Sequence, residues 1–252
     1  MRIFLSLIFA LCITPAWAQE SDLHSPWDTI LSQYLSEHAD GVNRFDYDAL
    51  RTNTEDRARL EQYINDLSTQ KPSLMEHDHA FAFWANLYNA VTIKVILDAA
   101  PSRSIRQIRP RPWNIGPWGQ DRVTVEGRNL SLNNIEHDIM RDEFESAQVH
   151  YTVNCASMGC PNLKTTAWRG DTLSADIEAA ARAYINHPRG VTVTDRGLVV
   201  SNIYQWFKAD FGGDNDGVMA HLLEYAEPDL VAAINANPRI VGHEYDWALN
   251  RP

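Results

Sequence analysis

One apolar segment restricts the possible folds of this chain more than any other feature. The stretch FAFWANLYNAVTIKVIL at residues 81–97 would be apolar around almost its whole circumference if it formed a helix. A helix without a polar face belongs in a protein interior. We therefore expect a buried central helix from about Ser73 to Ala99, which ends before Pro101 because proline disfavours helix in the preceding residue.

Shorter patterns around this segment predict a mixed fold. Helices are expected from Ser25, with Pro26 in the first turn, around residues 60–67, 131–140 and 173–187, and in two or three short pieces between 202 and 235. The other expected elements are hairpins at 122–132 and 191–201, a strand at VHYTVN (149–154), a strand-like run within 240–252, and links at 44–51 and 102–120. Helices that come first and hairpins that come later are typical of the α+β class. The predicted fold is a central buried helix packed on an antiparallel sheet, with extra N-terminal helices.

The N-terminal residues have the pattern of a secretory signal peptide. Arg2 precedes an apolar stretch, and Ala16-Trp17-Ala18 provides the small residues that a signal peptidase requires. We expect cleavage after Ala18 and export to the periplasm or the exterior, with no membrane association afterwards. Residues 19–252 should then form a single α+β domain, with a helical extension at 19–70 and a core at 71–252.

The balance of charges restricts the possible partners. The chain carries 22 basic and 33 acidic side chains and a formal net charge of −11. Nucleic acids and anionic membranes both require a basic surface, so neither is an expected partner. A peptide-like molecule, or a small thiol or carboxylate, is the expected kind of substrate. The sequence does not indicate an oligomeric state.

Cys155 and Cys160 are the two cysteines that would remain after signal cleavage. An exported protein can join them in a disulfide, which requires Cα atoms within about 7 Å. A helical turn that opened at Cys155 would instead hold them about 8–9 Å apart, so these two interpretations exclude each other. A metal centre is not expected, because C-x4-C with an upstream histidine is not a standard zinc spacing. No other cofactor is expected.

A third interpretation makes Cys155 a nucleophile. Backbone N–H groups at a strand-to-turn junction lower the pKa of a thiol and can hold an oxyanion. His137 is the expected base, because His150 in an extended strand would lie about 16 Å from Cys155 with its side chain on the opposite face. Glu136 or His150 would orient the His137 imidazole. The alternative is that His137 is a surface or packing histidine.

Other polar side chains have two possible roles. Asn86 and Asn89 interrupt the apolar helix. Asn86 could donate to the oxyanion and Asn89 could bind substrate, or at least one of them could make structural hydrogen bonds instead. Arg109 and Trp113 lie in a segment rich in arginine and could bind an anionic substrate. The alternative is that these arginines pair with acidic residues of the protein itself.

Five segments in this order resemble the family known as domain of unknown function 547. They are FWANLYNAVTIKVIL (83–97), SLNNIEHDIMR (131–141), VHYTVNCASMGCPNL (149–163), SNIYQWFKADFG (201–212) and YDWALN (245–250). The recurring residues of the family fall here on Glu136, His137, His150, Cys155, Cys160 and Pro161. The resemblance implies a fold of the papain-like and transglutaminase-like group. In that group the nucleophile normally begins the central helix, whereas here the thiol follows the predicted strand.

Two functions therefore follow from the sequence. The first is an exported thiol-dependent hydrolase or acyl transferase that acts on an amide or thioester of a peptide-like substrate, with Cys155 as nucleophile and a histidine as base. The alternative is a non-catalytic binding or assembly module with a Cys155–Cys160 disulfide.

Overall fold

Helix α4 (His77–Ala99) forms the centre of the protein, as its apolar sequence predicts. The computed structural model describes residues 16–109, 111, 113–144 and 147–252. By length and composition α4 could span a membrane, but 94% of its most apolar window is buried inside the protein, as expected for a core helix. The helix ends at Ala99, and the capping residue Ala100 adopts a left-handed conformation with φ of 46° before Pro101.

In the described part of the chain, three α-helices, two short strands and one 3₁₀ turn precede α4. They are α1 (Ala16–Tyr34), β1 (Leu35–Ser36), β2 (Arg44–Phe45), α2 (Tyr47–Thr52), α3 (Thr54–Ser68) and the 3₁₀ turn η1 (Pro72–Leu74). The predicted start of the first helix at Ser25 is wrong, because Pro26 lies inside α1. The expected link at 44–51 instead contains β2 and most of α2. The predicted signal peptide lies almost entirely outside the described residues, so cleavage after Ala18 stays a prediction.

The chain after α4 alternates between short strands and short helices. Its first half contains η2 (Ile105–Gln107), β3 (Asp121–Val125), β4 (Arg128–Ser131), the π-helix η3 (Asn134–Arg141), α5 (Asp142–Phe144), η4 (Ala147–Tyr151) and η5 (Gly170–Thr172). Its second half contains α6 (Leu173–Ile185), β5 (Val191–Thr194), β6 (Gly197–Ser201), α7 (Ile203–Trp206), η6 (Lys208–Phe211), α8 (Asn215–Tyr225), α9 (Pro228–Ala236) and β7 (Ile240–Glu244). Both predicted hairpins and the helix after the cysteines are confirmed.

The expected strand at VHYTVN is wrong. Residues Ala147–Tyr151 form the 3₁₀ helix η4, and Thr152 closes it by donating from its backbone N–H and its hydroxyl to Val149 O. The following backbone groups bond to α4 rather than to a neighbouring strand. The Asn89 amide donates to Thr152 O and accepts from the N–H of Asn154, both at 2.8 Å.

The predicted mixture of helices and sheets is confirmed. The expected antiparallel sheet packed on the central helix is not found in the part of the chain that the structure describes. The strands form three small sheets, β1–β2, β3–β4 and β5–β6–β7, and β7 runs parallel to β6. Helix α4 packs mainly against α2, α3, η3 and η5. Because α4 is apolar on every side, all its faces must pack against other elements, and here these are helices and turns.

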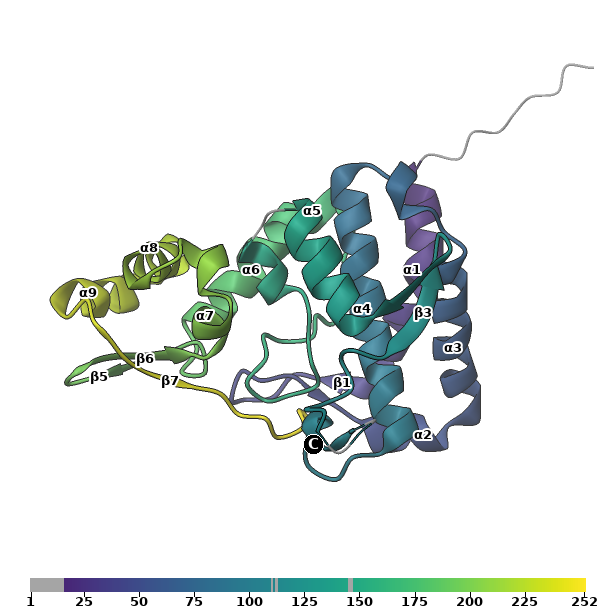
Figure 1. Ribbon diagram of the computed structural model, residues 1–252, viewed down its shortest axis with the longest axis horizontal. Coiled ribbons are helices and arrows are strands. Elements are labelled where there is room, and N and C mark those ends of the chain that lie inside the picture. The colour runs from purple at the N-terminus through teal and green to yellow at the C-terminus, as the bar shows by residue number, and fades with distance from the viewer. Residues whose placement is uncertain (1–15, 110, 112, 145–146) are drawn as a thin grey trace, which may run out of the picture.

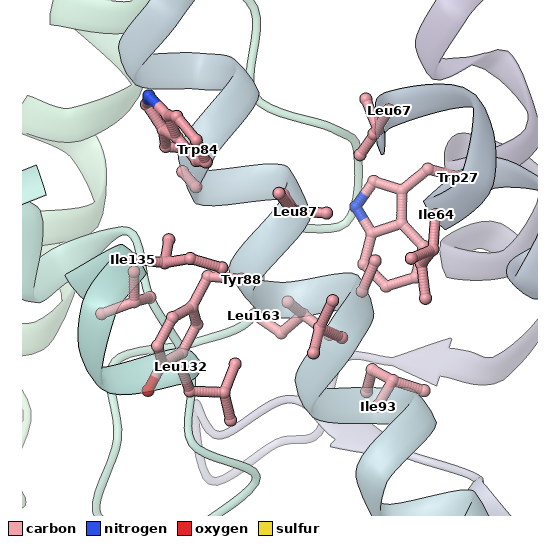
Figure 2. Packing of buried hydrophobic residues seen from close by; sticks show 14 of the residues in the cluster. Trp27, Ile64, Leu67, Trp84, Leu87, Tyr88, Ile93, Leu132, Ile135 and Leu163 are labelled. Atoms are coloured by element: carbon pink, nitrogen blue, oxygen red, sulfur yellow. The ribbon is translucent and has the colours of Figure 1, made fainter. Parts of the chain in front are cut away.

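Two apolar clusters hold these elements together. The larger one surrounds α4, and Figure 2 shows Trp27, Ile64 and Leu67 on one side of this helix and Tyr88 and Ile135 on the other. The smaller cluster joins α6, β6 and α8. Figure 1 shows β5, β6 and β7 with α8 and α9 at the opposite side of the molecule from α1 and α3.

Candidate functional site

A cavity of about 230 Å³ brings together most of the residues that the sequence indicated. Its lining includes Glu136 and His137 from η3, His150 from η4, and both Cys155 and Cys160. Aromatic side chains form most of the remaining wall. They are Tyr88, Trp118, Trp206, Phe207, Tyr245 and Trp247. The cavity is therefore a small apolar pocket with two thiols and two imidazoles on its surface.

The two thiols are in direct contact. Cys155 and Cys160 are free cysteines whose Sγ atoms lie 2.7 Å apart, which exceeds a disulfide bond length of about 2.05 Å. Cys155 is partly exposed, whereas Cys160 is 4% exposed. The helical turn at Cys155, one of the two interpretations that excluded each other, does not form. Cys155 begins a non-helical loop that folds back, with the N–H of Cys160 donating to Ser157 O at 3.1 Å.

Backbone hydrogen bonds fix the cysteine loop. Asn154 accepts from the N–H of Ala156 and donates to Pro161 O, both at 2.8 Å, which ties the two ends of the loop together. On its outer side the loop bonds to the C-terminal segment, since the N–H groups of Met158 and Gly159 donate to Ala248 O and Asp246 O at 2.8 Å. A Cβ atom on Gly159 would lie 2.9 Å from the backbone nitrogen of Asp246, so this contact requires glycine.

Two hydroxyl groups lie beside both sulfurs. The Tyr245 hydroxyl is 3.2 Å from Cys155 Sγ and 3.0 Å from Cys160 Sγ. The Ser157 hydroxyl is 3.3 Å from Cys155 Sγ and 3.4 Å from Cys160 Sγ. Cys160 Sγ also accepts from the backbone N–H of Cys155 at 3.0 Å. Four donors therefore converge on the buried sulfur, because the Cys155 thiol can also donate to it.

These hydrogen bonds shift the pKa values of the two thiols in opposite directions. Burial alone would raise the pKa of Cys160, but the hydrogen bonds from Cys155, Ser157 and Tyr245 outweigh it and lower the pKa to about 6. The pKa of Cys155 is raised well above its usual value by its hydrogen bond to Cys160 and by burial. This reverses our expectation that the turn would lower the pKa of Cys155. The thiolate of the pair resides on Cys160.

His150 is held by a carboxylate. Its Nε2 lies 2.7 Å from Asp210 Oδ2, and its ring stacks on Phe207 with centroids 4.2 Å apart. Arg141 also donates to both oxygens of Asp210, at 2.6 and 2.8 Å. Burial raises the pKa of Asp210, but hydrogen bonds from His150 and Arg141 hold it well below its usual value. Because His150 lies in a 3₁₀ helix, the strand geometry that separated it from Cys155 does not apply.

His137 is the more exposed imidazole, with 33% of its side chain accessible. Its Nδ1 is 3.5 Å from an Arg141 guanidinium nitrogen and 4.0 Å from Glu136 Oε1, too far for Glu136 to orient it by a hydrogen bond. Glu136 instead acts on Tyr88, whose pKa is raised well above its usual value by burial and then by the Glu136 charge. Among the described residues, no hydrogen bond joins either imidazole to a cysteine sulfur.

Four predicted site residues do not line this cavity. The Asn86 amide donates to Trp168 O at 3.0 Å and accepts from the backbone N–H of Trp168 at 2.9 Å. Asn89 accepts from the backbone N–H of Asn154, directly before Cys155. Both amides therefore make the structural bonds that were the alternative interpretation. Arg109 is exposed and donates to the backbone of Arg106. Trp113 is 74% exposed.

Several residues of the site were not predicted. Asp210, Tyr245 and Trp247 come from segments that we quoted for the family resemblance, but no local spacing connects them with the cysteines. Arg106, rather than Arg109, contacts the wall of the cavity, since its guanidinium lies 5.0 Å from the centroid of the Trp247 ring. Among the residues that the structure describes, no group of three or more histidine, cysteine or acidic side chains could hold a metal ion.

Comparison with known proteins relates part of the chain, but no activity, to a family. Residues 72–185 match the family model described as "Protein of unknown function, DUF547", which confirms the family resemblance predicted from the sequence for this part of the chain. The matched region extends from η1 to the end of α6 and includes both cysteines and both imidazoles. Asp210 and Tyr245 lie beyond it. No curated protein and no solved structure matches the chain.

Proposed function

We propose that the chain is an exported thiol-dependent hydrolase or acyl transferase whose active site is this cavity. The observation that carries the proposal is that a free, partly exposed thiol and a carboxylate-bound imidazole both line one pocket. A nucleophile, a base and a group that orients the base are the parts that covalent catalysis by cysteine requires. Export is proposed from the signal-peptide pattern of residues 1–18.

The proposed reaction proceeds through a thioester. The Cys155 sulfur forms a bond to the carbonyl carbon of an amide or thioester, its proton passes to an imidazole, and that proton leaves with the amine or thiol group. Water or another nucleophile then takes the acyl group and frees the sulfur. Cys155 is the attacking sulfur because it is partly exposed, whereas Cys160 is almost fully buried.

His150 is the better supported base. A catalytic imidazole is usually fixed by a partner on its other nitrogen, and Asp210 occupies that position on His150. Glu136 makes no such bond to His137. His137 was our expectation from the sequence and remains the second position to test, because it lines the same cavity and is more accessible.

The size of the cavity limits the substrate. A volume of about 230 Å³ is smaller than the roughly 300–1,000 Å³ typical of small-molecule sites. The aromatic wall suits an apolar group. We therefore propose that a peptide-like substrate inserts one end or one apolar side chain, while the rest lies outside. The predicted kinship with papain-like and transglutaminase-like folds is part of this proposal.

Alkylation of the native protein tests the proposed nucleophile. One cysteine of protein purified without reductant should react with iodoacetamide near neutral pH, where an imidazole can take its proton, and peptide mapping should identify it as the partly exposed Cys155. His150→Ala should slow the reaction more than His137→Ala, and His38→Ala serves as control because His38 is exposed. Equal rates in all three histidine variants would reject a catalytic imidazole.

The second candidate is a non-catalytic binding or assembly module with a Cys155–Cys160 disulfide. The closeness of the two sulfurs and the lack of a bond from either imidazole to them, within the described residues, favour it. In that case native protein would contain no reactive thiol until a strong reductant had been added.

A further inference from the structure

The contact between Cys155 and Cys160 supports a second kind of chemistry. In an acyl transferase one thiol is sufficient, yet here two thiols share one set of hydrogen-bond donors on the same cavity wall. We propose that Cys155 and Cys160 form a dithiol–disulfide couple that exchanges with a disulfide bound in the aromatic cavity. The expected partner is the disulfide of a small peptide-like molecule with an apolar or aromatic group beside the bond.

The loop geometry allows the bond to form with little movement. The sulfurs are separated by 2.7 Å, so a displacement below about 1 Å would bring them to bonding distance. The ends of the loop are tied through Asn154, and its middle is bonded to the C-terminal segment. This rigidity keeps both sulfurs in place in the reduced state, so formation of the disulfide does not require refolding of the loop.

The hydroxyl groups suit a negative charge that moves between the sulfurs. Exchange requires a thiolate on the attacking sulfur and then a thiolate on the resolving one. Tyr245 and Ser157 each lie 3.0–3.4 Å from both Sγ atoms, so either sulfur can accept from them. The two hydroxyls are also within 2.8 Å of each other, which joins the donors into one network.

Differences in exposure assign the two roles. Cys155 is partly exposed and is the more accessible sulfur for a ligand, whereas Cys160 is 4% exposed and lies against Cys155 Sγ. The Cys155 thiol passes its proton to the Cys160 thiolate, 2.7 Å away, as its sulfur attacks one sulfur of the ligand disulfide. A mixed disulfide forms, and the other ligand sulfur leaves as a thiolate, which takes the proton back from Cys160. The Cys160 sulfur then attacks Cys155 Sγ and expels the second ligand thiolate, which takes a proton from water. The protein gives up two electrons and the one proton that the pair held, and the ligand becomes two thiols.

The test uses the reduced full-length chain and the aromatic disulfide 5,5′-dithiobis(2-nitrobenzoate) as a probe. With one probe molecule per chain, the wild-type protein should release two aromatic thiolates and lose two hydrogens in intact mass. Cys160→Ser should release one thiolate and retain a stable mixed disulfide on Cys155. Cys155→Ser should react at least about tenfold more slowly, because the remaining thiol is buried.

A stable probe adduct on native wild-type protein would overturn the proposal, because Cys160 would then have failed to resolve it. Native protein that is already bridged and resists millimolar dithiothreitol would also overturn it. The wild-type measurement does not depend on whether the cysteine variants fold. Ser157→Ala and Tyr245→Phe should slow the second thiolate release, while Ser32→Ala, on the exposed side of α1, should not.

Failure of this inference is distinguishable from failure of the proposed acyl chemistry. A peptide thioester probe reports acyl transfer, which needs only Cys155 and a base. Turnover of the thioester without release of the second thiolate from the disulfide probe would reject the couple alone. The opposite result would reject the acyl transferase and retain the couple.

Discussion

His150 Nε2 lies 2.7 Å from Asp210 Oδ2, although the two residues are 60 positions apart in the sequence. Arg141 holds the same carboxylate with two hydrogen bonds, one to each oxygen. The π-helix η3, the 3₁₀ helix η4 and the 3₁₀ helix η6 therefore meet at one acidic side chain. This arrangement fixes the imidazole whose ring forms part of the cavity wall.

Loss of the Asp210 charge should impair the site. In Asp210→Asn, His150 loses the carboxylate that orients it, so turnover of a thioester substrate should fall about 10²-fold. The free energy of unfolding should fall by about 1–3 kcal/mol, less than for a fully buried pair because Arg141 and Asp210 keep 25% and 18% exposure. Steady-state kinetics and urea unfolding measure both effects.

Asp98→Asn is the matched control for this variant. Asp98 pairs with Arg57 and Lys94 at the surface, where ion pairs contribute about 0–1 kcal/mol. Unchanged turnover in Asp210→Asn would show that the carboxylate does not act through His150.

One thiol of the pair should lose its proton at a lower pH than an ordinary cysteine. Cys160 has its pKa lowered to about 6, so thiolate absorbance in the ultraviolet should appear with a midpoint near pH 6. Cys155→Ala removes one donor and should move this midpoint upward, and Tyr245→Phe should act in the same direction. A wild-type midpoint between pH 8 and 9, as in an unperturbed thiol, would contradict the hydrogen-bond account.

The sequence predicted the parts of this protein that depend on local pattern. The central helix follows from an uninterrupted apolar segment, and both hairpins follow from alternation around Gly127 and Gly197. The segment 149–154 was misassigned because its alternation looks like a strand. Its backbone partners are the side chain of Asn89 and its own Val149, which no pattern within the segment reveals.

Local pattern also predicted only part of the site. Cysteine and histidine residues could be selected by type, and Cys155, Cys160, His137 and His150 do line one cavity. Asp210 could not be connected with them, because only the folding of η6 against η4 brings it to His150. The acidity of the thiols could not be assigned either, since it depends on the distant Tyr245 hydroxyl.

Acid should destabilise the protein through His24. Burial and the nearby Arg169 charge lower the pKa of this 1%-exposed imidazole to about 3. Between pH 6.5 and 3 the unfolded chain binds a proton that the folded chain does not, so stability falls as the pH falls. The contribution is about 1.4 kcal/mol per pH unit within that window. Urea unfolding at several pH values measures the slope.

His24→Gln should reduce this slope, whereas His38→Gln should preserve it because His38 is exposed. Part of the slope should persist in His24→Gln, since the pKa of His221 is also lowered by burial, to about 4. An unchanged slope would mean that His24 is protonated in the folded protein.

Replacement of Asn89 should lower the free energy of unfolding. Asn89→Ala leaves the N–H of Asn154 and the carbonyl of Thr152 without their partner in the core, which should cost about 2–4 kcal/mol. Asn65→Ala, on the exposed face of α3, should change the free energy of unfolding by less than about 1 kcal/mol. Full stability with lost turnover would instead support the role in substrate binding that the sequence suggested for Asn89.

The most direct measurement is the mass of the protein after incubation with a peptide thioester. If Cys155 attacks a carbonyl group in this cavity, native wild-type protein should gain one acyl group, peptide mapping should find it on Cys155, and Cys155→Ala should gain none. An acyl group that appears only after the protein is unfolded would contradict the account, because the thiol would then have no catalytic environment in the folded state.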